Sequence, residues 1–193
     1  MKNFTFYSPT QVVFGRDGAD RAGELTAAFG GRKVLVHYGG GSAVRSGLLQ
    51  RVCRSLEDSG VTCVTLGGVK PNPRLSLIRE GIALGRREGV DFLLAVGGGS
   101  VIDSAKAIAY GLCMEGDVWD LYAKKAQAAS CLPLGAVLTI AAAGSETSNS
   151  SVITNDETGE KRGYSSDLCR CRFAVMDPAL TFTLPPYQTA SGC

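Results

Sequence analysis

Two stretches of this sequence repeat one design, in which an apolar run leads through three glycines and a serine into an amphipathic stretch. The runs are residues 33–38 and 92–96, and the glycine loops that follow them are residues 39–42 and 97–100. Glycine leaves backbone N–H groups uncovered, and a helix that begins there adds its positive dipole end. Each loop therefore predicts a phosphate site, first of all for the pyrophosphate of a nucleotide. A tight corner without a ligand is the alternative for one loop alone, and the repeat weakens that interpretation.

The glycine loops fit neither of the two common nucleotide fingerprints. Val44 and Ile102 occupy the third glycine positions of the dinucleotide motif G-x-G-x-x-G. Neither loop is followed by the Gly-Lys-Ser/Thr of a Walker loop. A related geometry for holding phosphate is therefore expected.

The composition indicates a globular chain. Its 193 residues are 45% hydrophobic and 20% charged, which suits one domain, or one domain with a short tail, and excludes disordered and collagen-like chains. The net charge of +2 is spread without a basic run, so nucleic acid is not an expected partner. No apolar run is long enough to span a bilayer, and residues 1–7 lack the apolar region of a signal peptide. We therefore expect a cytoplasmic protein without a membrane partner.

The cysteines and the single histidine favour structural roles. Seven cysteines, mostly isolated within apolar segments, are typical of buried thiols in a reducing compartment. The one close pair, Cys169 and Cys171, has neither a second pair nor a histidine nearby, which argues against a zinc site. His37 lies within the first apolar run, and we interpret it as a structural imidazole.

The order of apolar and amphipathic segments predicts a doubly wound α/β fold with a parallel sheet. The strands alternate with helical stretches and are apolar along their whole length, as in a sheet that helices cover on both faces. In such folds ligands bind at the carboxyl ends of the strands. The expected elements are strands at 33–38, 61–66, 92–96, 133–138 and 173–176, helices at 21–29, about 43–58, 75–87 and 101–112, a strand or hairpin from Phe4 and Phe6 to Val12 and Phe14 that closes at Gly15, and a hairpin around 155–161.

Three loops at these carboxyl ends are expected to line one crevice: residues 39–42, 70–73 and 97–100. Pro71 and Pro73 predict an extended Asn72 whose amide is free to bind a ligand, while a plain stop before a helix is the alternative. The small residues of 139–148 allow a flat ligand to approach the backbone closely.

The end of the chain predicts a second domain. Leu184, Pro185 and Pro186 lead into a stretch that is typical of a helix with proline in its first turn, and the sequence ends soon after, at Cys193. We therefore expect a truncated chain, in which residues 1–180 form the α/β domain and residues 181–193 begin another.

Taken together, these motifs resemble those of the iron-containing (group III) alcohol dehydrogenases, particularly the butanol dehydrogenase and NADPH-dependent aldehyde reductase branch. The resemblance covers essentially the whole chain, and the order of its pieces makes it specific. Glycerol dehydrogenase and dehydroquinate synthase share the fold but fit the two ends of the chain less well. The matching motifs are Phe6-Tyr7-Ser8-Pro9-Thr10, Val13-Phe14-Gly15, Tyr38-Gly39-Gly40-Gly41-Ser42, Pro71-Asn72-Pro73, Gly97-Gly98-Gly99-Ser100 with Asp103, Ala105 and Lys106, Leu138-Thr139, Gly144-Ser145-Glu146, Met176-Asp177-Pro178 and Leu184-Pro185-Pro186.

The resemblance implies an activity as well as a fold. In that family an N-terminal α/β domain, like that of dehydroquinate synthase, binds NAD(P), and a C-terminal helical domain supplies most of a site for iron or zinc on one aspartate and three histidines. Hydride would pass between the nicotinamide and a primary alcohol or aldehyde, and the family's dimers imply a homodimer through the N-terminal strand. The metal-binding aspartate would lie just beyond Cys193 and the histidines later. We therefore expect these 193 residues to bind neither iron nor zinc at the family's usual site. We also expect them to contain no catalytic residue and to turn over no substrate alone.

The resemblance also implies which residues bind the cofactor. For Lys161 alone, a solvated charge on a hairpin is the alternative. The implied contacts are the pyrophosphate on Gly98, Gly99 and Ser100, the adenosine end near Gly40, Gly41, Ser42 and Asn72, and the nicotinamide side near Thr139 and Lys161, with Asp103 also in the site.

The first glycine loop bears on the choice of cofactor. Members of the family that prefer NAD often carry an acidic residue there, whereas Gly40 and Gly41 leave room for a 2′-phosphate within reach of Ser42 and Arg45. We expect NADP(H) to be preferred, with NAD possible. Two other functions stay open: a nucleotide-binding or dimerisation module without catalysis, and a fragment of a glycerol dehydrogenase-like enzyme.

Overall fold

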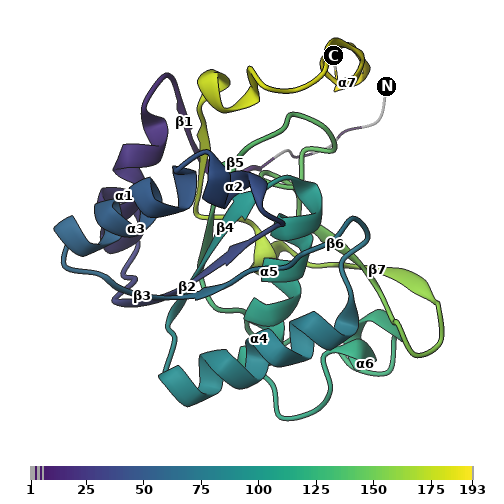
Figure 1. Ribbon diagram of the computed structural model, residues 1–193. Coiled ribbons are helices and arrows are strands. Elements are labelled where there is room, and N and C mark those ends of the chain that lie inside the picture. Colours follow the sequence, from purple (N-terminus) through teal and green to yellow (C-terminus); the bar gives the residue numbers. More distant parts are fainter. Residues whose placement is uncertain (1–2, 4, 6, 193) are drawn as a thin grey trace.

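A six-stranded parallel sheet forms the centre of the computed structural model, which describes residues 3, 5 and 7–192 (Figure 1). The strands lie in the order β1-β8-β5-β4-β2-β3, and every neighbouring pair runs parallel. This arrangement confirms the predicted doubly wound α/β fold. The strands of the sheet are β1 (Gln11–Phe14), β2 (Lys33–Tyr38), β3 (Thr62–Leu66), β4 (Phe92–Gly97), β5 (Leu134–Leu138) and β8 (Phe173–Met176), and β6 (Ser150–Thr154) and β7 (Lys161–Ser165) form a separate antiparallel hairpin.

Helices cover both faces of the sheet (Figure 1). Successive side chains of a strand point to opposite faces. Val34 and Val36 of β2 accordingly pack in the core beneath α1 and α3, whereas Leu35 packs in the core beneath α4 and α5. The helices are α1 (Ala22–Ala28), α2 (Ser42–Arg45), α3 (Leu48–Asp58), α4 (Leu75–Glu88), α5 (Gly99–Leu112), α6 (Trp119–Tyr122) and α7 (Pro186–Gly192), with 3-10 turns at Gly18–Arg21, Asp167–Cys169 and Pro178–Thr181.

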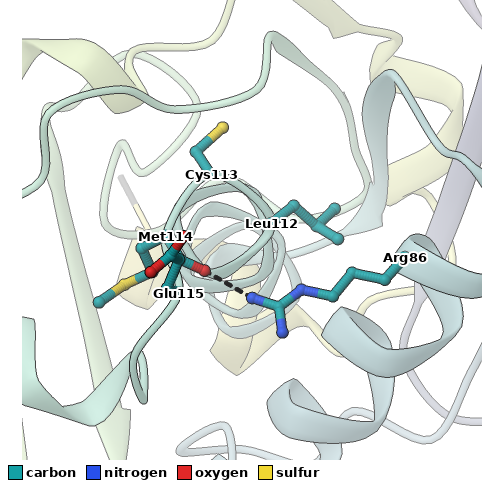
Figure 2. Close-up of a pocket in the computed structure, with 5 residues that line it drawn as sticks. All are labelled: Arg86, Leu112, Cys113, Met114 and Glu115. Atoms are coloured by element: carbon teal, nitrogen blue, oxygen red, sulfur yellow. Dashed lines mark hydrogen bonds between the residues drawn. The ribbon is translucent and has the colours of Figure 1, made fainter.

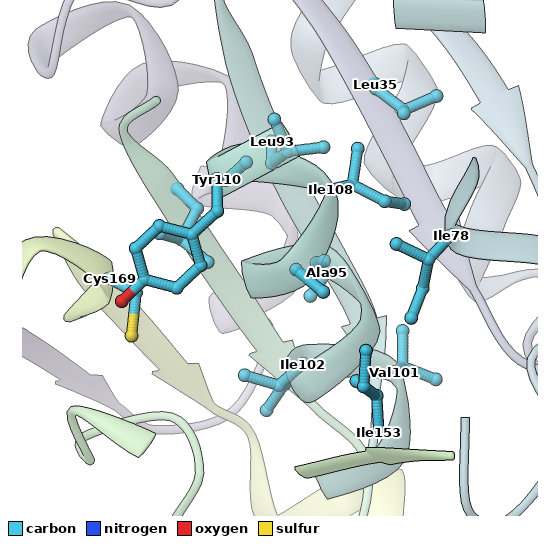
Figure 3. Close-up of a cluster of buried hydrophobic side chains, with 14 of the residues drawn as sticks. Leu35, Ile78, Leu93, Ala95, Val101, Ile102, Ile108, Tyr110, Ile153 and Cys169 are labelled. Atoms are coloured by element: carbon cyan, nitrogen blue, oxygen red, sulfur yellow. The ribbon is translucent and has the colours of Figure 1, made fainter. Parts of the chain in front are cut away.

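The core between β4 and α5 holds the second glycine loop in place. Every residue of β4 is buried, as the unbroken apolar run predicted. Figure 3 shows Leu93 and Ala95 of β4 facing a layer that includes Ile102 and Ile108 of α5, and Ile153 of β6 joins the same cluster. Burial of such aliphatic side chains contributes about 1.5–3 kcal/mol each. The helix that begins at the loop is thus fixed against the sheet along its length.

The strand order reverses between β2 and β4. From β2 the chain passes through α3, on one face, to β3 at the edge of the sheet. From β4 it passes through α5, on the other face, to β5 in the opposite direction. Loops that leave neighbouring strands toward opposite faces open a crevice at the carboxyl ends, where α/β proteins bind ligands. Both glycine loops lie at this point, because they directly follow β2 and β4.

Several local predictions were wrong. The helix expected at about 43–58 is two helices, α2 and α3, because Gly47 between them adopts a left-handed φ of 76°. Of the strand or hairpin expected at the N-terminus, the described residues contain the strand, β1, which pairs in parallel with β8; Phe4 and Phe6 lie outside the described residues. The short α6 was not expected at all. Among the described residues, no helix combines the length and apolar character needed to cross a bilayer.

Candidate nucleotide-binding site

Backbone hydrogen bonds join the loops at the carboxyl ends of the strands. The N–H of Thr139, after β5, donates to the carbonyl of Gly97 at 3.2 Å. The N–H of Gly68, after β3, donates to the carbonyl of Gly39 at 3.0 Å. A Cβ on Gly39 would lie 3.5 Å from a methyl group of Val101, in the first turns of α5. The loops after β2, β3, β4 and β5 therefore lie next to one another along this edge of the sheet.

The second glycine loop ends in a helix N-terminus that no side chain of the described residues caps. Gly98 occupies the N-cap position of α5 in an extended conformation and makes no side-chain cap hydrogen bond. The N–H groups of the first turn have no partners within a helix, and Gly99 and Ser100 lie in that turn, half-buried. A Cβ on Gly98 would come within 2.5 Å of the Ile140 side chain, so the packing itself requires glycine. The backbone here is arranged to receive an anion.

The first glycine loop is built differently. It leads into α2, a helix of only four residues, so its dipole contributes little. Nothing lies within 4 Å of a Cβ placed on Gly40, whereas the guanidinium of Arg45 lies directly over Gly41. This loop, with Ser42 at its end, therefore combines open space at Gly40 with a nearby positive charge on the exposed Arg45.

Asn72 and Lys161 lie in contact. The resemblance implied that Asn72 binds the adenosine end of the cofactor and Lys161 the nicotinamide side. The Nζ of Lys161 donates to Oδ1 of Asn72 at 2.7 Å. Asn72 has a φ of 59°, so the extended conformation predicted from its flanking prolines is wrong. Asparagine tolerates the left-handed region better than most residues, and its amide oxygen here serves Lys161 rather than staying free. Lys161 itself is exposed at the start of β7.

Asp103 connects α5 to the hairpin. Its Oδ2 accepts a hydrogen bond from the Val152 N–H at 3.0 Å. Its Oδ1 is buried and has no hydrogen-bond partner among the described residues. Burial raises the pKa of this carboxyl group. A buried acceptor without a donor is costly, and a ligand with an N–H or O–H group could satisfy it.

The site also contains a residue for which the sequence suggested no role. Lys106 is fully buried on α5, and its ammonium group binds the loop before β6. A lysine flanked by alanines in a largely apolar helical stretch was the available signal, because a buried charge needs partners.

His37 is held by hydrogen bonds on both ring nitrogens. Nδ1 lies 2.9 Å from the Leu66 carbonyl, and Nε2 lies 2.8 Å from Oγ of Ser104. A carbonyl can only accept, so Nδ1 carries the proton, and Nε2 of the neutral ring accepts from Ser104. Burial lowers the pKa of His37 to about 4. The imidazole connects β2, β3 and α5, which agrees with a structural role.

Lowering the pH from about 6.5 to about 4 is expected to weaken the fold through His37. In this range the imidazole of the unfolded chain takes up a proton, whereas the buried imidazole does not. Proton binding therefore lowers the free energy of the unfolded state relative to the folded state. The free energy of unfolding should fall by about 3 kcal/mol across the window. Urea denaturation of the wild type and of His37→Asn at several pH values measures this. Equal pH dependence in the two proteins would contradict the assignment.

One pocket lies far from these loops, at the C-terminal end of α5. It has a volume of about 450 Å³, and Figure 2 shows Arg86 and Met114 in its lining. Nη2 of Arg86 donates to the carbonyls of Gly111 at 2.9 Å and Met114 at 2.6 Å. Such bonds satisfy carbonyl groups that a helix end leaves free, so Arg86 has a structural role here.

Comparison of this sequence with known protein families identifies the family to which it belongs. The profile of the iron-containing alcohol dehydrogenases matches residues 9–178. The chain belongs to this family. A probable NADH-dependent butanol dehydrogenase of Bacillus subtilis is 49% identical over 192 residues, and the NADPH-dependent aldehyde reductase YqhD of Escherichia coli is 38% identical over 195. The crystal structure of NADH-dependent butanol dehydrogenase A from Thermotoga maritima is 46% identical, with a TM-score of 0.96.

These matches confirm the resemblance found in the sequence and identify an oxidoreductase family. Each match covers 100% of this chain but only 48% or 49% of the relative. The chain thus spans about half the length of the iron-containing alcohol dehydrogenases that it matches.

The iron implied by the family has no matching ligand set in the part of the chain that the structure describes. No group of three or more His, Cys, Asp or Glu residues there is placed to hold a metal ion. Cys169 and Cys171 are both buried, and burial raises the pKa of Cys171 to about 12, which disfavours the thiolate that binds metal. The described residues do not fit a metal, and we derive no catalytic step through one.

Proposed function

We propose that this chain is the cofactor-binding part of an NADP(H)-dependent alcohol dehydrogenase or aldehyde reductase, which acts on a primary alcohol or aldehyde. The observation that carries the proposal is the uncapped N-terminus of α5 at the reversal of strand order, with a second glycine loop beside it. Family membership supplies the reaction class. The bound cofactor would give or take a hydride at the nicotinamide.

The residues of the chain divide between two ends of such a dinucleotide. First-turn N–H groups of α5, at Gly99 and Ser100, would bind the pyrophosphate, which is the strongest anionic group of the cofactor. Arg45 and Ser42 would bind the adenosine end, beside the open space at Gly40. Two residues would lie at the other end: Thr139, which follows β5 and whose N–H is already bound to Gly97, and Asp103 on α5, whose buried Oδ1 lacks a donor among the described residues.

We further propose that these 193 residues do not turn over substrate alone. The described residues offer no set of metal ligands, and the reaction needs an electrophile to polarise the substrate oxygen. Aldehyde-dependent oxidation of NADPH by the isolated chain, measured with and without a chelator, tests this. Turnover that the chelator abolishes would overturn it.

Replacing Arg45 with alanine is expected to weaken NADPH binding by about tenfold or more while changing NADH binding less than about twofold. The reason is that a guanidinium beside Gly41 can pair with the 2′-phosphate, which only NADPH carries. Relatives of this chain are named for either cofactor, so their names leave the choice open. Titration calorimetry of the wild type and the variant with both nucleotides measures the preference.

Arg54→Ala is the matched control for this experiment, because Arg54 is an exposed arginine on α3. It should leave both affinities unchanged. Tighter binding of NADH than of NADPH by the wild type, or an equal loss of both in Arg45→Ala, would defeat the proposed preference.

We also propose that two copies associate through β1. This strand lies at the edge of the sheet, and among the described strands it pairs only with β8. Phe14 is 74% exposed and Val12 is 49% exposed, and an open edge with apolar side chains associates readily. Such an assembly would also suit a binding module without catalysis. Light scattering should give about twice the mass of one chain, and the mass of a single chain would contradict the proposal.

A further inference from the structure

Lys106 is a charged side chain on α5, a helix whose residues are mostly buried. It is 0% exposed, and its neighbours in sequence are the buried residues Ala105 and Ala107. Burying an ammonium group without compensation costs many kcal/mol, so such a group persists only when other atoms replace its water. The atoms that bind the ammonium group in place of water therefore indicate the role of Lys106.

The replacement is a set of oxygen atoms from one short segment of the chain. Nζ of Lys106 donates to the carbonyls of Ser145 at 2.7 Å, Ser148 at 2.8 Å and Ser150 at 2.9 Å, and Oγ of Ser148 lies at 3.2 Å. An ammonium group has three protons, and three carbonyls accept them. The loop at 145–150 is thus folded around this cation.

Asp103 holds the same segment one turn earlier on α5. Residues three apart on a helix lie on one face, so Asp103 and Lys106 both point toward the segment. The carboxylate binds the N–H of Val152, just past the loop, while the ammonium binds carbonyls within it. The two side chains together attach residues 145–152 to α5.

The attached loop borders the proposed pyrophosphate site. A Cβ on Gly99 would lie 3.2 Å from Oγ of Ser145, which places this serine against the first turn of α5. A dinucleotide with its adenosine end at the β2 loop and its pyrophosphate at α5 must continue past β4 toward β5. The nicotinamide half would then meet residues 139–150.

We propose that Lys106 is a positioning residue that shapes the nicotinamide side of the site by fixing the loop at 145–150. This inference rests on the proposed cofactor binding. Lys106 itself is covered by the carbonyls that it binds, so it acts through the loop and touches no ligand. Its loss should affect the half of the cofactor that meets the loop and spare the half that does not.

The test compares two nucleotides on the 193-residue chain: NADPH and 2′-phospho-ADP-ribose, which lacks the nicotinamide. In Lys106→Met the affinity for NADPH should fall at least about tenfold, while that for 2′-phospho-ADP-ribose stays within about twofold. Lys106→Arg, which keeps the charge and its donors, should recover most of the NADPH affinity. Lys125→Met, at an exposed lysine, is the control and should match the wild type.

The outcomes separate this inference from the function on which it rests. A wild-type chain that binds neither nucleotide overturns the proposed cofactor binding. A wild-type chain that binds both, with a Lys106→Met variant that loses both equally or loses neither, overturns the positioning role alone. Circular dichroism checks folding, and if Lys106→Met is unfolded, the same two titrations on the milder Lys106→Gln decide in the same way.

Discussion

Replacing Gly99 with aspartate is expected to weaken NADPH binding by about 100-fold or more without destabilising the fold. A carboxylate at the first position of α5 would lie beside the pyrophosphate, and like charges a few ångströms apart repel by several kcal/mol when partly shielded from water. The same carboxylate is favourable for the helix itself, because it meets the positive end of the helix dipole. For this one variant, calorimetric titration should therefore show weakened NADPH binding, while thermal denaturation should show no loss of stability.

Gly99→Ala separates the charge from the added bulk. Among the described residues, a Cβ there meets the Ser145 side chain, with Oγ at 3.2 Å and Cβ at 3.8 Å, so a slight shift of one side chain accommodates it. The alanine variant should bind NADPH within about fivefold of the wild type. If the aspartate variant bound as tightly as the alanine variant, the pyrophosphate would not lie at this helix N-terminus.

Replacing Gly23 with alanine is expected to lower the free energy of unfolding by at least about 3 kcal/mol. Gly23 is where α1 crosses α3, and a Cβ at this position would collide with the backbone carbonyl of Ser55. The Gly23 N–H also donates to Oγ of Ser55 at 2.9 Å, so the two helices cannot separate without losing this bond. Urea denaturation followed by circular dichroism measures the loss.

Gly163→Ala is the matched control for the Gly23 variant. A Cβ on Gly163, in β7, would have its closest neighbour at 3.6 Å, an ordinary contact. The free energy of unfolding should change by less than about 1 kcal/mol. Similar losses in the two variants would mean that the crossing of α1 and α3 is less tight than the structure has it.

The strands of the sheet could be predicted from the sequence because burial on both faces leaves a simple mark. A strand such as β4, with Leu93 and Ala95 on one face and Leu94 on the other, must be apolar at every position. The glycine loops were equally visible, since both follow such runs directly. The predicted position of the site at the carboxyl ends follows from these two features together.

Contacts between distant residues could not be predicted in this way. The break at Gly47 lies within an amphipathic stretch whose apolar spacing continues across it, so only the backbone conformation shows it. Asn72 and Lys161 are separated by 89 positions, and their pairing depends on how the β6–β7 hairpin packs. The partners of Lys106 lie 39–44 positions further along, in a loop without any periodicity.

Binding of NADPH to the wild-type 193-residue chain can be measured by isothermal titration calorimetry. We expect saturable binding of one NADPH per chain, competed by 2′-phospho-ADP-ribose, because both molecules carry the pyrophosphate and the 2′-phosphate that the glycine loops and Arg45 would hold. A chain that is folded by circular dichroism and yet shows no saturable binding of NADPH or NADH would contradict it.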